Sequence, residues 1–376
     1  MFKLNEQIRF NIFSFISTFA RSLIEIFISL YLFKNGYSIQ CIILFYFFTN
    51  LFAIPLSYFF VKIGEKTKYI YIMIIGLIAF VIVQLLLRNI IQSSYYLLLI
   101  SFIYSIYRRG YWVARRFYIT QIMPTQKTSE LFSIVLVMSQ LASIAAGYVG
   151  SIILSNVNIL ALTIISSILL FLSVIPLLGI KYNNDLKDIK LKENLKKYDK
   201  KNYLIFSFYE LNNLVTFIFP IYIALYVENS YSLAGNLNAV SNIAIILFII
   251  FYGKVLNKKK NYLIVSTILV LLCLILKLNI NNYFILAIYF FEGIITKMQN
   301  QSVNKIYFEN RGSMDLTHYN LIYQITECSV RALVTFPLIF IKDIKIMIIL
   351  VILVIFFLLM IYIFNTKNNR TAVWRK

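Results

Sequence analysis

Twelve runs of mostly apolar residues follow one another along the chain, and most are long enough to cross a lipid bilayer as a helix. A bilayer-spanning helix needs about 20 such residues. The runs are continuously apolar and do not alternate, so they predict helices and not the strands of a lipid-facing barrel. We therefore expect an all-α integral membrane protein with about twelve transmembrane helices. The runs cover residues 9–33, 39–61, 69–87, 95–117, 131–154, 159–180, 203–227, 233–253, 262–276, 283–305, 317–341 and 346–364.

The position of charge along the chain supports this interpretation. Only 14% of the 376 residues are charged, against about 25% in an ordinary globular domain. The formal net charge is nevertheless +21, because basic residues concentrate in the loops and the tail on one side of the predicted helices. This asymmetry follows the positive-inside rule and predicts a cell-membrane protein with both termini in the cytoplasm. The charge is a topology signal, so we expect no nucleic-acid partner. The opposite side carries only Lys34, Arg88, Lys277, Lys342 and Lys345.

A polar segment divides the twelve runs six and six. Residues 181–202, KYNNDLKDIKLKENLKKYDKKN, form the longest polar stretch and are interpreted as a lysine-rich cytoplasmic linker. The two parts also resemble each other, since FISLYLFKNGYSI joins the first two runs and FPIYIALYVENSYSL joins the seventh and eighth. This internal repeat predicts two pseudo-symmetric six-helix bundles, residues 1–180 and residues 203–376 with a short tail, and a central site where the repeats meet.

Charged residues inside the apolar runs indicate where that site lies. A charged side chain at the bilayer centre costs at least about 2.5–3.5 kcal/mol on insertion scales, so it persists mainly opposite a partner or a watery cavity. Such residues fall on the first, fourth, seventh and tenth runs, a period of three, and also on the eleventh. Two pairs have the i,i+4 spacing of an ion pair within one helix. The charges are Arg21, Glu25, Arg108, Arg109, Arg115, Arg116, Glu210, Glu292, Lys297, Glu327 and Arg331, and the pairs are Arg21 with Glu25 and Glu327 with Arg331.

The fourth run carries four arginines in the stretch YSIYRRGYWVARRFY. On a helix they fit within about 120° of arc around Trp112. Arg115 and Arg116 fall at the inner boundary of the bilayer, so we expect them at headgroup level. Arg108 and Arg109 lie about two turns deeper. We therefore expect these two to line a central aqueous cavity.

The tenth run has a matching polar part, EGIITKMQNQSVNK, which contains Glu292 and Lys297. In the repeat, Arg109 occupies a position comparable with Glu292. Opposite charges are thus expected to face each other across the pseudo-symmetry axis. Such a pair can act as a gate if it joins in one state and separates in another, and a permanent buried bridge is the alternative.

Twelve helices divided six and six by a basic loop, with an internal repeat and a charge period of three, resemble the major facilitator superfamily of transporters over essentially the whole chain. The family motif between the second and third helices, Gly-x3-Asp-Arg-x-Gly-x-Arg/Lys-Arg/Lys, falls on SYFFVKIGEKTK. Lys62, Gly64 and Lys66 match this motif, whereas Ser57 and Val61 replace its first glycine and its aspartate.

The resemblance implies alternating access, in which a cavity lined by the first, fourth, seventh and tenth helices opens in turn to each side of the membrane. It also implies that transport can be coupled to protons through a membrane-embedded carboxylate. Glu210 and Glu292 are the first candidates, since neither has an i,i+4 basic partner in its own helix. Glu25 and Glu327 are the other candidates.

We accordingly expect a secondary active transporter of a small solute in either direction, and the cationic face of the fourth run favours an anionic or zwitterionic one. The alternatives are a lipid-linked saccharide flippase and a polytopic membrane enzyme such as an acyl or glycosyl transferase. The expected translocation residues are Arg108, Arg109, Arg21, Glu25, Trp112 and Lys297, and the expected gating or proton-coupling residues are Glu210, Glu292, Glu327 and Arg331.

The motifs of enzymes are missing from the sequence. It contains no phosphate-binding glycine loop, no metal-ligand cluster and no nucleophile-base pair. We therefore expect no enzyme activity, no cofactor and no metal. The expected partners are a small-molecule substrate and the lipid bilayer, with the protein acting as a monomer.

Overall fold

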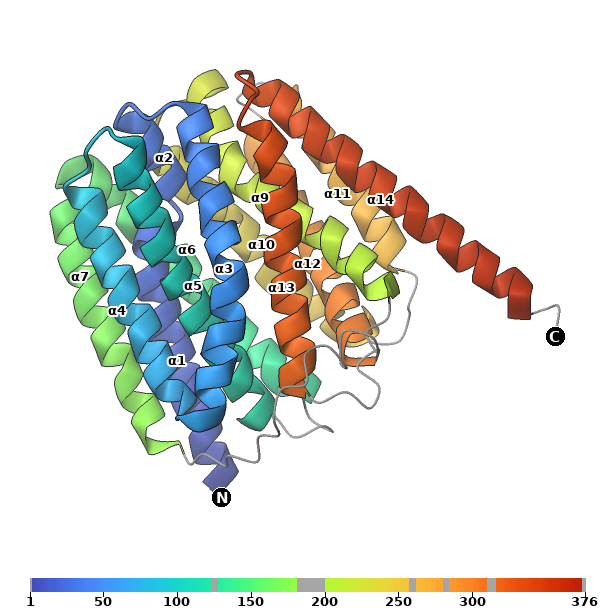
Figure 1. Ribbon diagram of the computed structural model, residues 1–376, viewed down its shortest axis with the longest axis horizontal. Coiled ribbons are helices and arrows are strands. Elements are labelled where there is room, and N and C mark those ends of the chain that lie inside the picture. The colour runs from blue at the N-terminus through green and yellow to red at the C-terminus, as the bar shows by residue number, and fades with distance from the viewer. Residues whose placement is uncertain are drawn as a thin grey trace.

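The computed structural model describes residues 2–122, 128–180, 200–256, 262–279, 284–309 and 316–373. Within these ranges the chain is helical almost throughout and contains no β-strand. The helices run side by side between the two ends of the molecule (Figure 1). Most of the expected linker, residues 181–199, lies outside the described residues.

Each of the twelve predicted spans corresponds to a helical segment in the described ranges. The first half of the chain contains α1 (Phe2–Glu25), α2 (Ile28–Lys34), α3 (Ile39–Lys66), α4 (Tyr69–Arg88), α5 (Ser94–Ile122), α6 (Thr128–Asn156), α7 (Ile159–Val174) and the 3-10 helix η1 (Ile175–Gly179). The second half contains α9 (Lys200–Tyr226), α10 (Tyr231–Leu256), α11 (Tyr262–Leu278), α12 (Ile285–Glu309), α13 (Leu316–Leu338) and α14 (Ile344–Val373). The first span consists of α1 and α2, and the sixth of α7 and η1.

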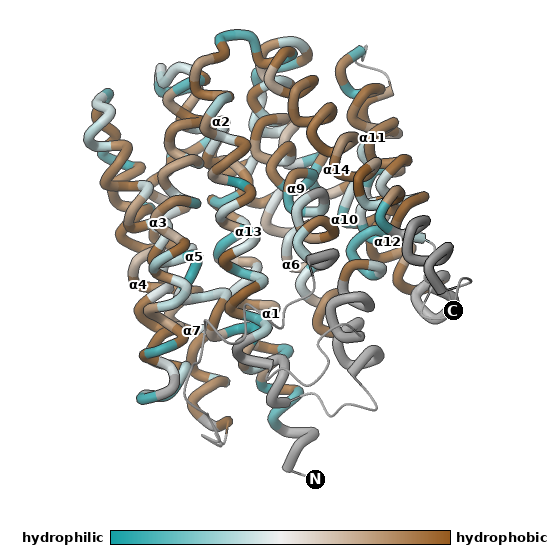
Figure 2. The backbone as a smooth tube through the Cα atoms, turned by 45° about the vertical axis from the view of Figure 1, so that its right-hand side comes forward, coloured by the Kyte–Doolittle hydropathy of each residue, from teal (hydrophilic) through white to brown (hydrophobic). Residues whose placement is uncertain are grey.

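Hydropathy separates the helices into two groups. Eight helical segments in the described residues are long and apolar enough to cross a membrane, and α11 is apolar but shorter. The remaining helices, α5, α12 and α13, carry most of the charges that lie inside the bundle. Figure 2 shows mostly hydrophobic colouring along α4, α11 and α14, and paler or hydrophilic stretches along α5, α9 and α13. The predicted all-α membrane fold is thus confirmed.

The turn between α2 and α3 follows from its residues. Gly36 has a φ of +85°, in the left-handed region that glycine adopts without a steric penalty. Ser38 then caps α3, because its Oγ accepts a hydrogen bond of 3.3 Å from the backbone N of Cys41. These two residues reverse the chain between the first and second spans.

The first span is broken, which the sequence did not predict. The apolar run 9–33 reads as one helix, yet α1 ends at Glu25 and α2 begins at Ile28. No proline or glycine lies at the break. The local backbone bond runs instead from Phe27 N to Ile24 O, at 2.9 Å. The interruption places Glu25 at the end of α1, beside a cavity described below.

The two halves contact each other closely where α6 packs against α10. Gly147 and Gly235 face each other there, and a Cβ atom added to Gly235 would lie 2.6 Å from the carbonyl oxygen of Gly147. Beside them, Asn238 Nδ2 donates to the backbone oxygen of Ser143 at 3.3 Å. Small residues let the two backbones approach, as is common between membrane helices.

Candidate functional site between the two halves

A cavity of about 360 Å³ lies between the two halves of the chain. The first half contributes residues near the break between α1 and α2, and the second half contributes α9 to α12. Its wall combines aromatic rings, hydroxyls, amides and a few charges, as ligand sites often do. The lining residues are Ser22, Glu25, Ile26, Ser29, Thr216, Phe217, Phe219, Pro220, Ile223, Ala234, Leu237, Asn238, Ser241, Lys277, Tyr289 and Glu292.

Glu25 is the charged residue on the first-half wall. Its Oε2 pairs with Arg21 Nη1 at 3.1 Å, which confirms the predicted i,i+4 ion pair. Its Oε1 accepts a hydrogen bond from the Tyr104 hydroxyl at 3.0 Å. Arg21 also donates to the Tyr107 hydroxyl at 3.0 Å. The Glu25 side chain is 23% exposed, so it keeps access to the cavity while its charge is balanced.

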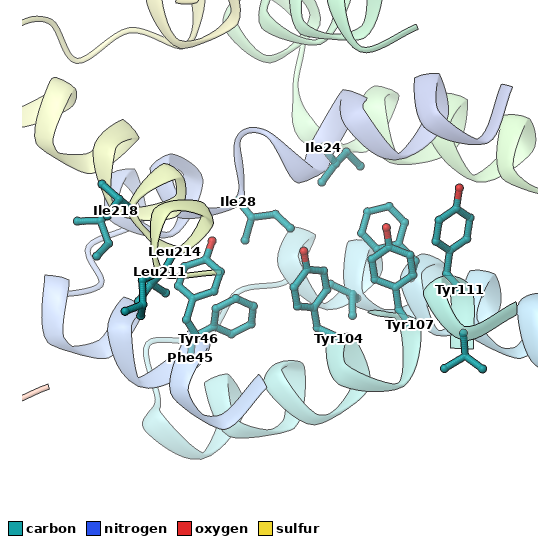
Figure 3. Close-up of a cluster of buried hydrophobic side chains, with 14 of the residues drawn as sticks. Ile24, Ile28, Phe45, Tyr46, Tyr104, Tyr107, Tyr111, Leu211, Leu214 and Ile218 are labelled. Carbon is teal, nitrogen blue, oxygen red and sulfur yellow. The ribbon is translucent and has the colours of Figure 1, made fainter. Parts of the chain in front are cut away.

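Three tyrosines of α5 support this wall. Figure 3 shows Tyr104, Tyr107 and Tyr111 in a row along α5, next to the helix that carries Ile24. The Arg21 guanidinium lies 4.3 Å from the ring centre of Tyr111, a cation-π distance. The tyrosines therefore hold the ion pair in place by hydroxyl and ring contacts together.

The second-half wall contains a second ion pair. Lys277 Nζ lies 2.5 Å from Glu292 Oε2. The same ammonium lies 3.7 Å from the ring centre of Tyr289 and 4.4 Å from that of Phe219. Each wall of the cavity thus carries one acid balanced by one base.

These contacts correct one expectation and extend another. Lys277 was expected on the outer side of the membrane helices, but it lies in the last turn of α11 and is only 3% exposed. Glu292 has no i,i+4 basic partner in its own helix, as the sequence indicates, but Lys277 supplies one from the neighbouring helix. The i,i+4 rule detects partners within one helix only.

A cluster of arginines lies outside the cavity, at the contact between α5 and α13. Four guanidinium groups surround the carboxylate of Glu327 at N–O distances of 3.4–3.7 Å. We call this group the arginine cage; its members are Arg108, Arg109, Arg116, Arg331 and Glu327. The predicted pair of Glu327 with Arg331 is confirmed. The other three arginines reach Glu327 from the opposite half of the chain.

Glu210 of α9 extends the cage within the second half. Its Oε2 lies 2.5 Å from Arg331 Nη2. Its Oε1 accepts a hydrogen bond of 2.7 Å from the Tyr323 hydroxyl. Glu210 has no basic partner in its own helix, as the sequence indicates, but Arg331 of α13 pairs with it. The Glu210 carboxylate is buried and does not belong to the cavity lining.

The structure places several other predicted residues differently. Arg108 and Arg109 belong to the cage and not to the cavity lining. Arg109 pairs with Glu327, so the expected pairing with Glu292 does not form. Arg115 is buried against protein groups, because its Nη2 donates to Ser139 at 3.4 Å and its guanidinium lies 5.1 Å from the ring centre of Trp112. Its position at headgroup level stays a prediction.

Trp112 and Lys297 also lie outside the cavity lining. The ring of Trp112 lies near two guanidiniums, with its centre 5.3 Å from that of Arg21 and 5.1 Å from that of Arg115. Lys297 of α12 is 4% exposed and forms no ion pair with the described residues. Both residues lie inside the helical bundle, but neither lines the cavity.

A polytopic helical bundle whose halves enclose a polar, charge-balanced cavity has the architecture of a membrane transporter. The family model of the Major Facilitator Superfamily matches residues 10–335. The chain belongs to this family and is a transporter, not an enzyme.

Solved structures of this family share the fold. The nucleoside transporter NupG superposes with a TM-score of 0.70 at 12% identity, over 96% of this chain and 98% of that one. FucP in the outward conformation gives 0.66 at 14%, over 95% and 98%. The E. coli fucose:proton symporter FucP gives 0.64 at 15%, over 96% and 99%. Among curated protein sequences no relative is found.

Proposed function

We propose that this protein is a secondary active transporter that carries a small zwitterionic solute by alternating access. The observation that carries the proposal is the cavity of about 360 Å³, which both halves of the chain line. A site shared by two halves is exposed to one side of the membrane or the other when the halves rock against each other.

The charges of the cavity favour a zwitterion over a simple anion. The two ion pairs, Arg21 with Glu25 and Lys277 with Glu292, leave the wall without net charge. A solute without net charge enters such a site without leaving a buried charge uncompensated. Its ammonium group suits the Glu25 carboxylate, and its acidic group suits Lys277. The rings of Phe217, Phe219 and Tyr289 add apolar contact.

The moving bodies are proposed to be the two predicted bundles, residues 1–180 and 203–376. The cage joins them, since Arg108, Arg109 and Arg116 lie on α5 and Glu327 lies on α13. Separation of these helices would break three ion contacts and open the end of the molecule where the cage lies. We therefore propose that the cage is the gate. The sequence led us to expect a gate formed by Arg109 and Glu292, whereas in the cage Arg109 contacts Glu327.

Coupling is proposed to run through the carboxylates that line the cavity. A coupling group must exchange protons with water, and among the described residues Glu25 and Glu292 are the carboxylates that line the cavity. Each also has a basic neighbour, so protonation of the carboxylate would release Arg21 or Lys277 to a solute. The fucose:proton symporter shares the fold of this chain, and its name gives the proton as its co-substrate.

The membrane is proposed to be the cell membrane, with both termini in the cytoplasm. Support comes from the excess of Lys and Arg in the loops that lie on the same side as the termini. In this orientation the cage lies toward the cytoplasmic side of the cavity.

Solute flux into liposomes tests the proposal. The purified native chain is reconstituted, and uptake of labelled amino-acid-like zwitterions, simple anions and neutral polyols is compared with and without a pH gradient. We expect saturable uptake of a zwitterion that the gradient accelerates. Uptake of anions or polyols alone would refute the zwitterion class, and uptake indifferent to the gradient would refute proton coupling.

A further inference from the structure

Three buried arginines of the arginine cage carry more positive charge than the carboxylates that they contact. Arg108, Arg109 and Arg331 share the two carboxylates of Glu327 and Glu210, which leaves an excess of one positive charge among these five residues. All five are buried between helices of a membrane protein, where an uncompensated charge is costly. The cavity pairs, in contrast, are balanced one to one. The excess is thus a local property of the cage.

Hydrogen bonding is also incomplete in the cage. Nε and Nη1 of Arg109, and the same two atoms of Arg331, are buried and have no hydrogen-bond partner in the described structure. Arg109 is only 1% exposed. Glu327 lies 3.4–3.7 Å from all four guanidiniums, whereas charge-assisted hydrogen bonds are about 2.7–2.9 Å long. One carboxylate is therefore shared among more donors than it can satisfy.

Separation of the halves would make this imbalance larger. Arg331 stays with Glu327 because both lie on α13, four residues apart. Arg108, Arg109 and Arg116 move with α5 and lose their contact with Glu327. The guanidiniums of Arg108 and Arg109 would then face an opening cleft with no carboxylate of the cage beside them. A guanidinium binds a carboxylate in a bidentate fork.

We propose that the arginine cage is a carboxylate-binding site, occupied by Glu327 in this conformation and by the carboxylate of the transported solute when the halves part at this end. Glu327 is then a tethered competitor of the solute. Its return to the cage releases the solute carboxylate and closes the gate. This inference rests on the proposed transport function and narrows the solute to a carboxylate-bearing one.

The cage lies within reach of the cavity. Tyr104 of α5 binds Glu25 at the cavity wall. Arg108 follows four residues later on the same helix, which is about 6 Å along its axis. A solute that moves by about one helical turn from the cavity therefore brings its carboxylate to the first arginine of the cage.

A substitution that empties the cage tests the site directly. Glu327→Ala removes the carboxylate and leaves space of about the size of acetate, whereas Glu327→Gln fills the same space with a neutral amide. Both are made in a Trp374→Phe background, so that Trp112, three residues after Arg109, is the single tryptophan of the chain. Melting temperature and tryptophan fluorescence are then followed in acetate and in chloride at equal ionic strength.

We expect acetate to stabilise Glu327→Ala and to change its fluorescence saturably, with no such effect of chloride and none on Glu327→Gln. Adding Arg109→Gln should weaken the acetate response of Glu327→Ala about tenfold or more, because one charge-assisted contact is lost. Equal responses to acetate and chloride, or an unchanged response after Arg109→Gln, would overturn the site. Glu327→Ala is tested in the same way if it folds only in the presence of anions. Folding in acetate and not in chloride then supports the carboxylate-binding site, and folding in neither refutes the site.

The native chain tests the link to transport. Exchange of a zwitterionic carboxylate in liposomes is compared with exchange of its amide, which lacks the acid and keeps the size. We expect exchange of the carboxylate only. Exchange of the amide at the same rate would refute a carboxylate-bearing solute and leave the transport function intact. A total lack of flux would count against the transport function. In that case the acetate experiment alone decides whether the cage binds a carboxylate.

Discussion

The contact between α6 and α10 provides a prediction whose size can be worked out. Substitution of Gly235 by alanine places a methyl group 2.6 Å from the carbonyl oxygen of Gly147 and 3.1 Å from Ser151 Cβ. Ordinary contact begins at 3.4 Å, so the two helices must move apart by about 0.8 Å. Overpacking of this kind costs about 1–3 kcal/mol. Alanine is favoured over glycine in a helix by about 1 kcal/mol, and this preference offsets that much of the overpacking cost.

We therefore expect Gly235→Ala to lower the free energy of unfolding by up to about 2 kcal/mol, since the clash involves a backbone atom that cannot rotate away. Gly147→Ala should cost less, because its methyl first meets the flexible Asn238 amide, at 3.1 Å. Ser232→Thr adds one methyl at an exposed position of α10 and serves as the control. Thermal unfolding of the purified variants measures the order. A Gly235→Ala protein as stable as the control would refute the reasoning about this contact.

Two further predictions concern the cavity. Glu292→Gln leaves the Lys277 ammonium buried without its partner, which should lower the free energy of unfolding by about 3–5 kcal/mol. Adding Lys277→Met to this variant should recover most of the melting temperature. A double variant as unstable as the single one would contradict the pairing. Glu25→Gln should lose proton-driven accumulation of solute and retain solute exchange, because the Glu25 carboxylate lines the cavity; normal accumulation by Glu25→Gln would exclude this residue from coupling.

The fold could be predicted from the sequence because the apolar runs are long and uninterrupted. A run such as 346–364 predicts a membrane helix, and the cost of burying charge placed Arg108, Glu210 and Glu292 in the interior without any structure. The break after Glu25 was not predictable, because no proline or glycine marks it.

The pairing of the charges could not be predicted in the same way. Glu327 binds Arg331 through local spacing, which the sequence reveals, but it binds Arg109 through the rotation of α13 against α5, which the sequence does not reveal. Lys277 lies at the end of an apolar run, so it resembled a loop residue until the structure placed it against Glu292. Partners on different helices depend on packing angles that hydropathy does not encode.

The central claim is that solute passes through the cavity between the two halves. Asn238 lines this cavity and carries a small polar side chain, so Asn238→Cys in a chain with Cys41, Cys273 and Cys328 replaced by alanine makes it a target for a hydrophilic thiol reagent. Solute exchange in liposomes is measured before and after labelling. We predict saturable exchange that labelling abolishes, with excess solute protecting the cysteine from the reagent. Exchange that continues at the same rate in the fully labelled protein would contradict the account.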